Sequence, residues 1–157
     1  MIRFEIERDE AWPPGAEAVP ARVAAVLVAL DLDEPLAGEV SVLFATDGDV
    51  RALNRDWRGK DRPTNVLSFP AEPVPGLPDE HQPLGDLALA FETCAREANA
   101  RGVPVLDHAT HLVLHGLLHL LGYDHRDGVE ARVMEGLEAR AMAAMGLHAP
   151  YEEEPAD

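Results

Sequence analysis

The chain has little cysteine, little lysine and little positive charge. Cys94 is the only cysteine among 157 residues, so no internal disulfide bond can form. Lys60 is the only lysine; the 13 basic residues face 29 acidic ones, and the formal net charge is −16. Proteins that bind nucleic acid by general attraction normally show a basic footprint. This charge therefore argues against a chain that binds RNA or DNA with its whole surface.

The sequence also lacks a long apolar run and a segment with the pattern of a signal peptide. With a lone cysteine, these absences predict a cytoplasmic protein in a reducing compartment, with no membrane partner. A chain of this length fits one domain spanning residues 1–157, which buries roughly 68–70% of its unfolded surface.

Histidine is concentrated in one stretch: five of the seven histidines lie between His108 and His125. His115 and His119 are four residues apart, so on a helix they lie on one face, separated by only about 40°. Gly122 then ends the helix in a left-handed conformation, and the chain turns back so that His125 can approach the pair. Three converging imidazoles with an open fourth position are the arrangement of catalytic zinc.

Leucine and valine surround these histidines and make the helix apolar nearly all round, which is typical of a buried helix. Imidazoles buried there without partners would each cost roughly 1–3 kcal/mol. We therefore expect one divalent ion per chain. Zinc fits best, and nickel or copper can also occupy an all-nitrogen site. Cys94 has no partner motif and is not expected to be a fourth ligand.

The same spacing, H-x-x-x-H-x-x-G-x-x-H, is the ligand pattern of one class of zinc protease. Those proteases carry a glutamate general base directly after the first histidine, where this chain has Gly116. The metal geometry is retained, but peptide hydrolysis would lack its base.

The few basic residues gather in one segment. Within twelve residues, only Asp56 and Asp61 oppose Arg51, Arg55, Arg58, Lys60 and Arg62. A local positive patch on a repelling body would accept RNA in one orientation. The alternative is a solvated helix face that runs into a turn.

The apolar periodicity predicts the element order β-α-β-α-β-β-α-α-α. The expected strands are residues 2–8, 40–45, 65–70 and 85–91, and the expected helices are 19–32, 48–57, 92–100, 105–121 and 128–145. Asp47 and Asp127 are the expected N-caps of the second and last helices. The proline-rich segment 70–83 is either an adjustable rim of the site or a plain connection. Residues 147–157 should form an acidic, frayed tail.

This order predicts an α+β fold, a small mixed sheet packed with helices around a central metal-binding helix. Two blocks of the sequence also resemble a known family, the YbeY-type endoribonucleases of bacterial ribosomal-RNA maturation. The blocks are HGLLHLLGYDH at residues 115–125 and RGKDRPTNVLSFP at residues 58–70, and the LGD of residues 84–86 agrees with them. The resemblance extends weakly from about residue 38 to 151. It implies the same fold class and a metal-dependent endonuclease for single-stranded RNA, with ribosomal RNA and the ribosome or its small subunit as partners, and not DNA.

The resemblance assigns the family's arginine to Arg58. A planar guanidinium near the metal would stabilise the negative charge that builds on phosphoryl oxygens. Asp124 is either a residue that orients a ligand or a turn residue. His111 either lines the same cleft or is a core histidine with a backbone partner. Asn65 and Ser68 would shape the floor of the site, although strand packing explains them equally well.

Two other functions remain open from the sequence. One is a metalloprotease, which the missing glutamate weakens. The other is a ribosome-assembly or partner-binding protein with a structural zinc ion. A fourth protein ligand would favour the structural zinc, whereas an open cleft beside the metal would favour catalysis.

Overall fold

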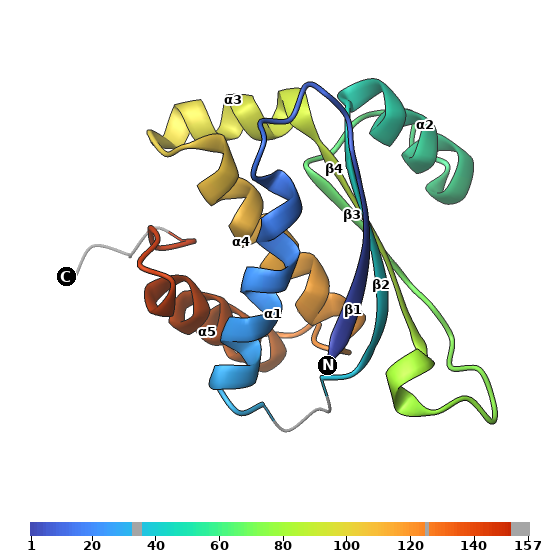
Figure 1. The fold of residues 1–157 in the computed structure, drawn as a ribbon. Coiled ribbons are helices and arrows are strands. Elements are labelled where there is room, and N and C mark those ends of the chain that lie inside the picture. Colours follow the sequence, from blue (N-terminus) through green and yellow to red (C-terminus); the bar gives the residue numbers. More distant parts are fainter. Residues whose placement is uncertain (33–35, 125, 152–157) are drawn as a thin grey trace.

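The computed structural model describes residues 1–32, 36–124 and 126–151 (Figure 1). Its strands are β1 (Ile2–Arg8), β2 (Gly38–Ala45), β3 (Val66–Pro70) and β4 (Pro83–Ala90). Its helices are α1 (Val19–Ala29), α2 (Asp47–Arg58), α3 (Phe91–Arg101), α4 (Val105–Leu120) and α5 (Gly128–Ala144), with short 3-10 turns at Ala16–Ala18 and Asp79–His81. The predicted element order is confirmed.

The four strands form one mixed sheet in the order β1-β2-β4-β3. β1, β2 and β4 run parallel, and β3 pairs antiparallel with β4. The proline-rich segment 70–83 is therefore the connection of a β3–β4 hairpin. The α+β fold class is confirmed, and β3 is left as an edge strand beside the helices.

The sheet has helices on both faces, but unequally. Figure 1 shows α1 and α4 on one face and α2 on the other. Side chains alternate along each strand, so Val40, Val42 and Phe44 of β2 belong to the large core under α1 and α4. Leu43 and Ala45 belong to the small core under α2.

α4 is the central helix, in contact with β3, β4, α1, α3 and α5. Leu114, Leu117 and Leu118 are fully buried, and truncating such a leucine to alanine typically costs 2–5 kcal/mol. Gly116 lies where α4 packs closely on the sheet. A Cβ atom there would lie 2.7 Å from Leu87 Cδ2 and 3.2 Å from Ser68 Oγ. This close approach brings the neighbouring histidines up to β3.

The predicted cap of α2 is wrong by one residue. Thr46 is the N-cap: its side chain accepts from the Asp49 amide, and Asp49 accepts from the Thr46 amide, which is a reciprocal capping box. Asp47 instead accepts from the amide and hydroxyl of Thr93, both at 2.9 Å, and so ties α2 to α3. The cap at Asp127 is confirmed, since its carboxylate accepts from two amides of α5.

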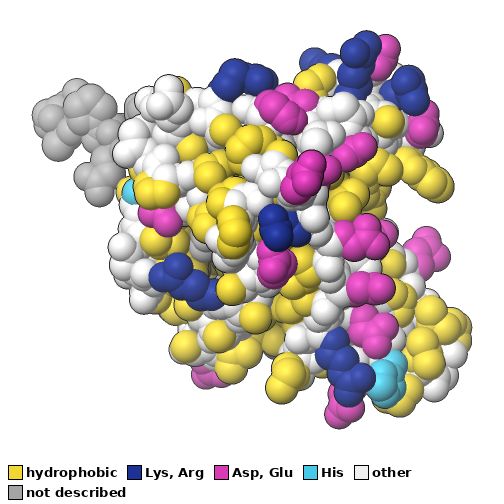
Figure 2. Space-filling view, turned by 45° about the horizontal axis from the view of Figure 1, so that its top comes forward, with side chains coloured by type: hydrophobic (Ala, Val, Ile, Leu, Met, Phe, Trp, Pro, Cys, Tyr) yellow, Lys and Arg dark blue, Asp and Glu magenta, His cyan; other side chains and the backbone are white. Residues whose placement is uncertain are grey.

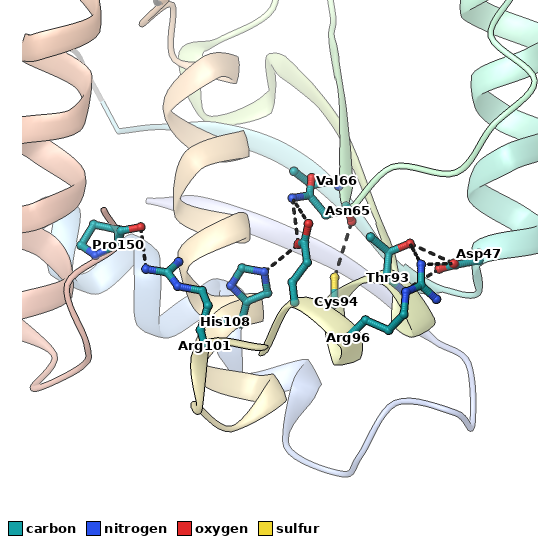
Figure 3. Close-up of polar contacts among 10 residues, drawn as sticks. Asp47, Asn65, Val66, Thr93, Cys94, Arg96, Arg101, His108 and Pro150 are labelled. Atoms are coloured by element: carbon teal, nitrogen blue, oxygen red, sulfur yellow. Dashed lines mark hydrogen bonds and ion pairs between the residues drawn. The ribbon is translucent and has the colours of Figure 1, made fainter. Parts of the chain in front are cut away.

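The end of α1 and the C-terminal segment differ from the prediction. α1 ends at Ala29, because Asp31 takes a left-handed conformation with φ 55°; the predicted end was residue 32. The tail prediction is wrong for residues 147–151. Arg101 Nη2 donates to the carbonyls of Ala149 (3.1 Å) and Pro150 (3.0 Å; Figure 3), and the Tyr151 hydroxyl donates to Glu138. The rest of the predicted tail lies outside the described residues.

The surface carries no broad basic area on the face drawn in Figure 2, where small groups of basic side chains stand apart among acidic and hydrophobic ones. Within residues 1–32, 36–124 and 126–151, no helix is both long and apolar enough to cross a bilayer.

Candidate metal centre and active-site cleft

An open cleft of about 730 Å³ lies where α4 meets the edge strand β3. It brings together residues of both sequence blocks. It is lined by Arg58, Asn65, Val66, Ser68, Pro70, His111, Leu112, His115, His119, Leu120, Gly122, Tyr123, Asp124 and Tyr151. Of segment 70–83, only Pro70 reaches this cleft.

His115 and His119 face each other in the cleft, with their Nε2 atoms 3.2 Å apart. Two imidazole nitrogens bound to one tetrahedral zinc ion at 2.0–2.1 Å are about 3.3 Å apart. The pair therefore has the spacing of two ligands of one ion, and the helical geometry needs no rearrangement to hold it.

The third predicted ligand, His125, lies outside the described residues. Among the residues that are described, no group of three histidine, cysteine or acidic side chains surrounds a common metal position. The three-histidine site thus stays a prediction. Gly122 has the expected left-handed conformation, with φ 102°, so the chain turns directly after the helix as the site requires.

Glu138 of α5 hydrogen-bonds to His111 and His115 and does not itself line the cleft. It was not among the predicted site residues. Its side chain is fully buried. Oε1 accepts from His115 Nδ1 and from His111 Nε2, both at 2.9 Å. Oε2 accepts from the Tyr151 hydroxyl at 2.8 Å. His111 is therefore a cleft histidine with a carboxylate partner, where a backbone partner was the alternative.

Glu138 is ionised at neutral pH. Burial alone would raise its pKa, but the hydrogen bonds from His111, His115 and Tyr151 outweigh burial and lower the pKa to about 2. A carboxylate can only accept hydrogen bonds, so the proton of the neutral His115 ring sits on Nδ1. The Nε2 atom then faces His119 with its lone pair. Burial and the bond to Glu138 raise the pKa of Tyr151, so its hydroxyl keeps the proton it donates.

One feature of the sequence points to Glu138. The buried residues of α5 fall at helical spacing, at Met134, Leu137, Ala141 and Met142. Glu138 interrupts that stripe with an acid. A carboxylate on the buried side of a helix needs a charged or hydrogen-bonding partner, which here comes from α4.

Arg58 lies at the end of α2 and lines the cleft. Its Nη2 donates to the carbonyl of Ser68 at 2.5 Å, and its guanidinium lies 5.2 Å from the centre of the Phe69 ring. Because β3 is an edge strand, its backbone is open to this contact. The ring and the carbonyl hold the guanidinium at the β3 edge of the cleft.

The other basic residues of the segment divide into two groups. Arg51 forms two bonds to Asp61, of 2.7 and 3.2 Å, and this pairing lowers the pKa of Asp61. Arg55 pairs with Asp56 at 3.0 Å. Lys60 and Arg62 instead line a hollow of about 300 Å³ that shares Arg58 and Val66 with the cleft.

Asn65, which also lines the cleft, belongs with Cys94 to a network that joins the start of β3 to α3 and α4. Glu97 Oε1 accepts from Asn65 Nδ2 (3.1 Å) and His108 Nε2 (2.8 Å), and Figure 3 labels Asn65 and His108 among these contacts. Cys94 is buried on α3, with Sγ 3.6 Å from the Asn65 carbonyl oxygen. Burial raises the pKa of this thiol to about 12, so Cys94 is a protonated core residue that does not line the cleft.

Asp124 lines the cleft and pairs with Arg126 at 2.7 Å. Gly116, the position of the protease base, faces Leu87 and Ser68 of the sheet. A glutamate at that position would collide with the sheet.

Comparison with known proteins identifies the family of this chain. The family model described as "Endoribonuclease YbeY" matches residues 13–146. The endoribonuclease YbeY of Paramagnetospirillum magneticum is 52% identical over 163 residues, covering 98% of this chain and 99% of the relative. That of Sphingopyxis alaskensis is 45% identical over 164 residues, covering 96% and 98%.

A solved structure has the same fold. The solution structure of TM1509 from Thermotoga maritima matches with a TM-score of 0.57 at 20% identity, covering 100% of this chain and 99% of that one. At this identity the likeness concerns the fold alone. The family model and the full-length relatives confirm the resemblance found in the two sequence blocks, and the chain belongs to the endoribonuclease YbeY family.

Proposed function

We propose that the chain is a zinc-dependent endoribonuclease that cleaves single-stranded RNA and acts in ribosomal-RNA processing in the cytoplasm. The observation that carries the proposal is the pair of facing Nε2 atoms of His115 and His119, 3.2 Å apart, in the cleft that Arg58 also lines. Membership of the endoribonuclease YbeY family supports RNA as the substrate class.

His115, His119 and His125 would hold one zinc ion per chain, with nickel as a substitute. A zinc ion held by these residues would supply positive charge and would lower the pKa of a water molecule toward 7. The two described histidines present Nε2 atoms at ligand spacing, so the residues fit this ion.

Arg58 would bind the phosphoryl group that is attacked. A guanidinium can donate two parallel hydrogen bonds to phosphoryl oxygens, and it stabilises the charge that grows there in the transition state. The Ser68 carbonyl and the Phe69 ring fix one side of the guanidinium. Little side-chain entropy then remains to be lost when RNA binds.

Lys60 and Arg62 would bind a neighbouring phosphate, because they line the hollow that adjoins the cleft at Arg58. The net charge of −16 repels RNA elsewhere. This charge distribution favours a strand that enters past Lys60 and Arg62 and reaches the histidines at Arg58.

The carboxylate that bonds to His111 and His115 does not support a protease. Glu138 bonds to Nδ1 of His115, on the opposite side of the ring from Nε2. It is therefore not placed to take a proton from water in the cleft, and Gly116 cannot do so either.

The test compares three substrates: a labelled single-stranded RNA, the same RNA in a duplex, and casein. With one equivalent of zinc, the protein should cleave the single strand, cleave the duplex far more slowly and leave casein intact. Zinc binding without any RNA cleavage would favour the structural-zinc function instead. Casein cleavage that is lost in His115→Ala would establish the protease.

A further inference from the structure

Glu138 is a fully buried carboxylate, and the three side chains that hydrogen-bond to it among the described residues all line the cleft. A buried carboxylate is costly unless hydrogen bonds compensate it. Here the compensation comes from two imidazoles of α4 and one phenol of the C-terminal segment, at 2.8–2.9 Å. His111, His115 and Tyr151 line the cleft, and Glu138 contacts them from the buried side, without lining the cleft itself.

We infer that Glu138 is a positioning residue that fixes the ring of His115 so that Nε2 faces His119 and binds the metal. Tyr151 holds the carboxylate in place for that task. The inference rests on the proposed function, because it takes His115 to be a metal ligand.

An imidazole has two nitrogens, and rotation of the ring exchanges their positions. A carboxylate that accepts from Nδ1–H selects one tautomer and one ring orientation, and it makes Nε2 a stronger ligand. Glu138 does this with an oxygen that His111 also binds. The His111 ring lies edge-on to His115, 6.3 Å between centroids, and buttresses the arrangement from the next turn of α4.

The C-terminal segment completes the support. Tyr151 donates to the second oxygen of Glu138 and packs edge-on against His111, 5.5 Å between ring centroids. Arg101 of α3 binds the carbonyls of the two preceding residues. The segment after α5 therefore returns to the cleft at a fixed position, and residues far apart in the chain act on one imidazole.

The decisive variant is Glu138→Gln. The amide oxygen can still accept from both histidines, so the packing is retained while the negative charge is lost. The matched control is Glu135→Gln, which removes an equal charge from the exposed side of the same helix. Zinc affinity is measured by competition with a chelator, and the cobalt-loaded protein gives a visible spectrum that reports ligand geometry.

We expect Glu138→Gln to bind zinc roughly 10–100-fold more weakly than the parent, with an altered cobalt spectrum. The zinc affinity of Glu135→Gln should stay within about twofold of the parental value, because this residue lies outside the set that supports the ligand. A purely structural Glu138 would change the melting temperature and leave zinc affinity and the cobalt spectrum unchanged, and that result would overturn the inference.

Tyr151→Phe decides the matter if Glu138→Gln does not fold. It removes only the hydroxyl and keeps the ring against His111. Weaker zinc binding than in the parent supports the inference, and parental affinity with a parental cobalt spectrum overturns it. A parent that binds no zinc removes the proposed function as well. A parent that binds zinc and cleaves RNA, with variants equal to it, removes the positioning role alone.

Discussion

Two histidines of α4, His108 and His115, each bond to a glutamate of a neighbouring helix. They use different ring nitrogens for this bond. His108 uses Nε2 to reach Glu97 at 2.8 Å. Its Nδ1 is buried, with no hydrogen-bond partner among the residues described. His115 uses Nδ1 to reach Glu138 at 2.9 Å, which turns Nε2 toward His119.

The two histidines differ in which ring nitrogen bonds to the glutamate and in their exposure. The side chain of His108 is 5% exposed and ties α4 to α3, whereas that of His115 is 26% exposed and opens into the cleft. The two residues are seven positions apart on one face of the same helix. Residue type and spacing are thus alike, and only the tertiary structure separates a core histidine from one that we propose as a metal ligand.

The largest effect should come from removing a ligand. His119→Ala is expected to lose the single zinc equivalent and with it all RNA cleavage above background, because a two-nitrogen site binds zinc far more weakly. Elemental analysis and chelator competition measure the loss.

His108→Ala is the matched change on the other side of the comparison. It should keep one zinc per chain and lose roughly 1–3 kcal/mol of unfolding free energy, since Glu97 loses the hydrogen bond from His108 and keeps only that from Asn65. If His108→Ala lost zinc as completely as His119→Ala, the two kinds of histidine would not be distinct.

A second prediction extends the contrast to arginine. Arg58 and Arg22 each donate to a backbone carbonyl, of Ser68 and Met145 respectively, but only Arg58 lines the cleft. Arg58→Ala should lower the single-turnover cleavage rate roughly 10²–10³-fold at saturating RNA, with unchanged zinc content. Arg58→Lys should recover only part of the rate, because an ammonium cannot form the two parallel bonds.

Arg22→Ala should cleave at the parental rate. Equal rates for Arg58→Ala and the parent would reduce Arg58 to a surface residue and leave catalysis to the metal.

A third, smaller effect concerns RNA affinity. Replacing Lys60 and Arg62 together by glutamine should weaken binding roughly tenfold at physiological salt and lower the salt dependence of log K by about 1.4, the value for two single-strand phosphate contacts. Arg51 and Arg55, which the sequence alone also placed in RNA binding, are already paired with aspartates. The corresponding double variant should change affinity less, as fluorescence anisotropy at several salt concentrations would measure; an equal or larger loss would reverse the assignment of the two groups.

The smallest effect belongs to the core side of α4, where Cys94 lies under Asn65. Burial raises the pKa of its thiol from 9.0 to about 12, above the unfolded value. The stabilisation is therefore fully present below pH 9 and is lost as the pH rises from 9 toward 12. At pH 10 the loss should be about 1.4 kcal/mol.

Denaturant unfolding at pH 8 and pH 10 measures this loss of unfolding free energy. Zinc content and RNA cleavage, measured at the same two pH values, serve as controls. Cys94→Ser should show a smaller drop over the same interval. An identical drop in both proteins would show that other groups carry the pH dependence.

The sequence predicted what local spacing determines. The four-residue interval of His115 and His119, the left-handed Gly122 and the alternation in β1 depend on neighbours in the chain, and all three appear as expected. Arg58 beside the same cleft followed from the family resemblance, which supplies long-range information that periodicity lacks.

The supporting residues could not be predicted in this way. Glu138 is 23 positions from His115, and Tyr151 is 13 positions from Glu138. The fold alone brings them together. The tail was predicted to be frayed because the sequence shows its acidic charge. The bonds from Arg101 to the carbonyls of Ala149 and Pro150 join residues 48 and 49 positions apart, and the sequence does not show them. Asp47 was the predicted cap of α2, but Thr46 takes that position; both residue types are good caps, and only the geometry distinguishes them.

The proposed function requires the histidine cleft to be a metal-dependent catalytic site. The most direct measurement is single-turnover cleavage of a single-stranded RNA by metal-free protein, repeated while zinc is added up to two equivalents. We predict background cleavage without zinc, a linear rise to full rate at one equivalent, and no rise in His119→Ala. Full cleavage by the metal-free protein, or one tightly bound zinc with no cleavage, would contradict the account.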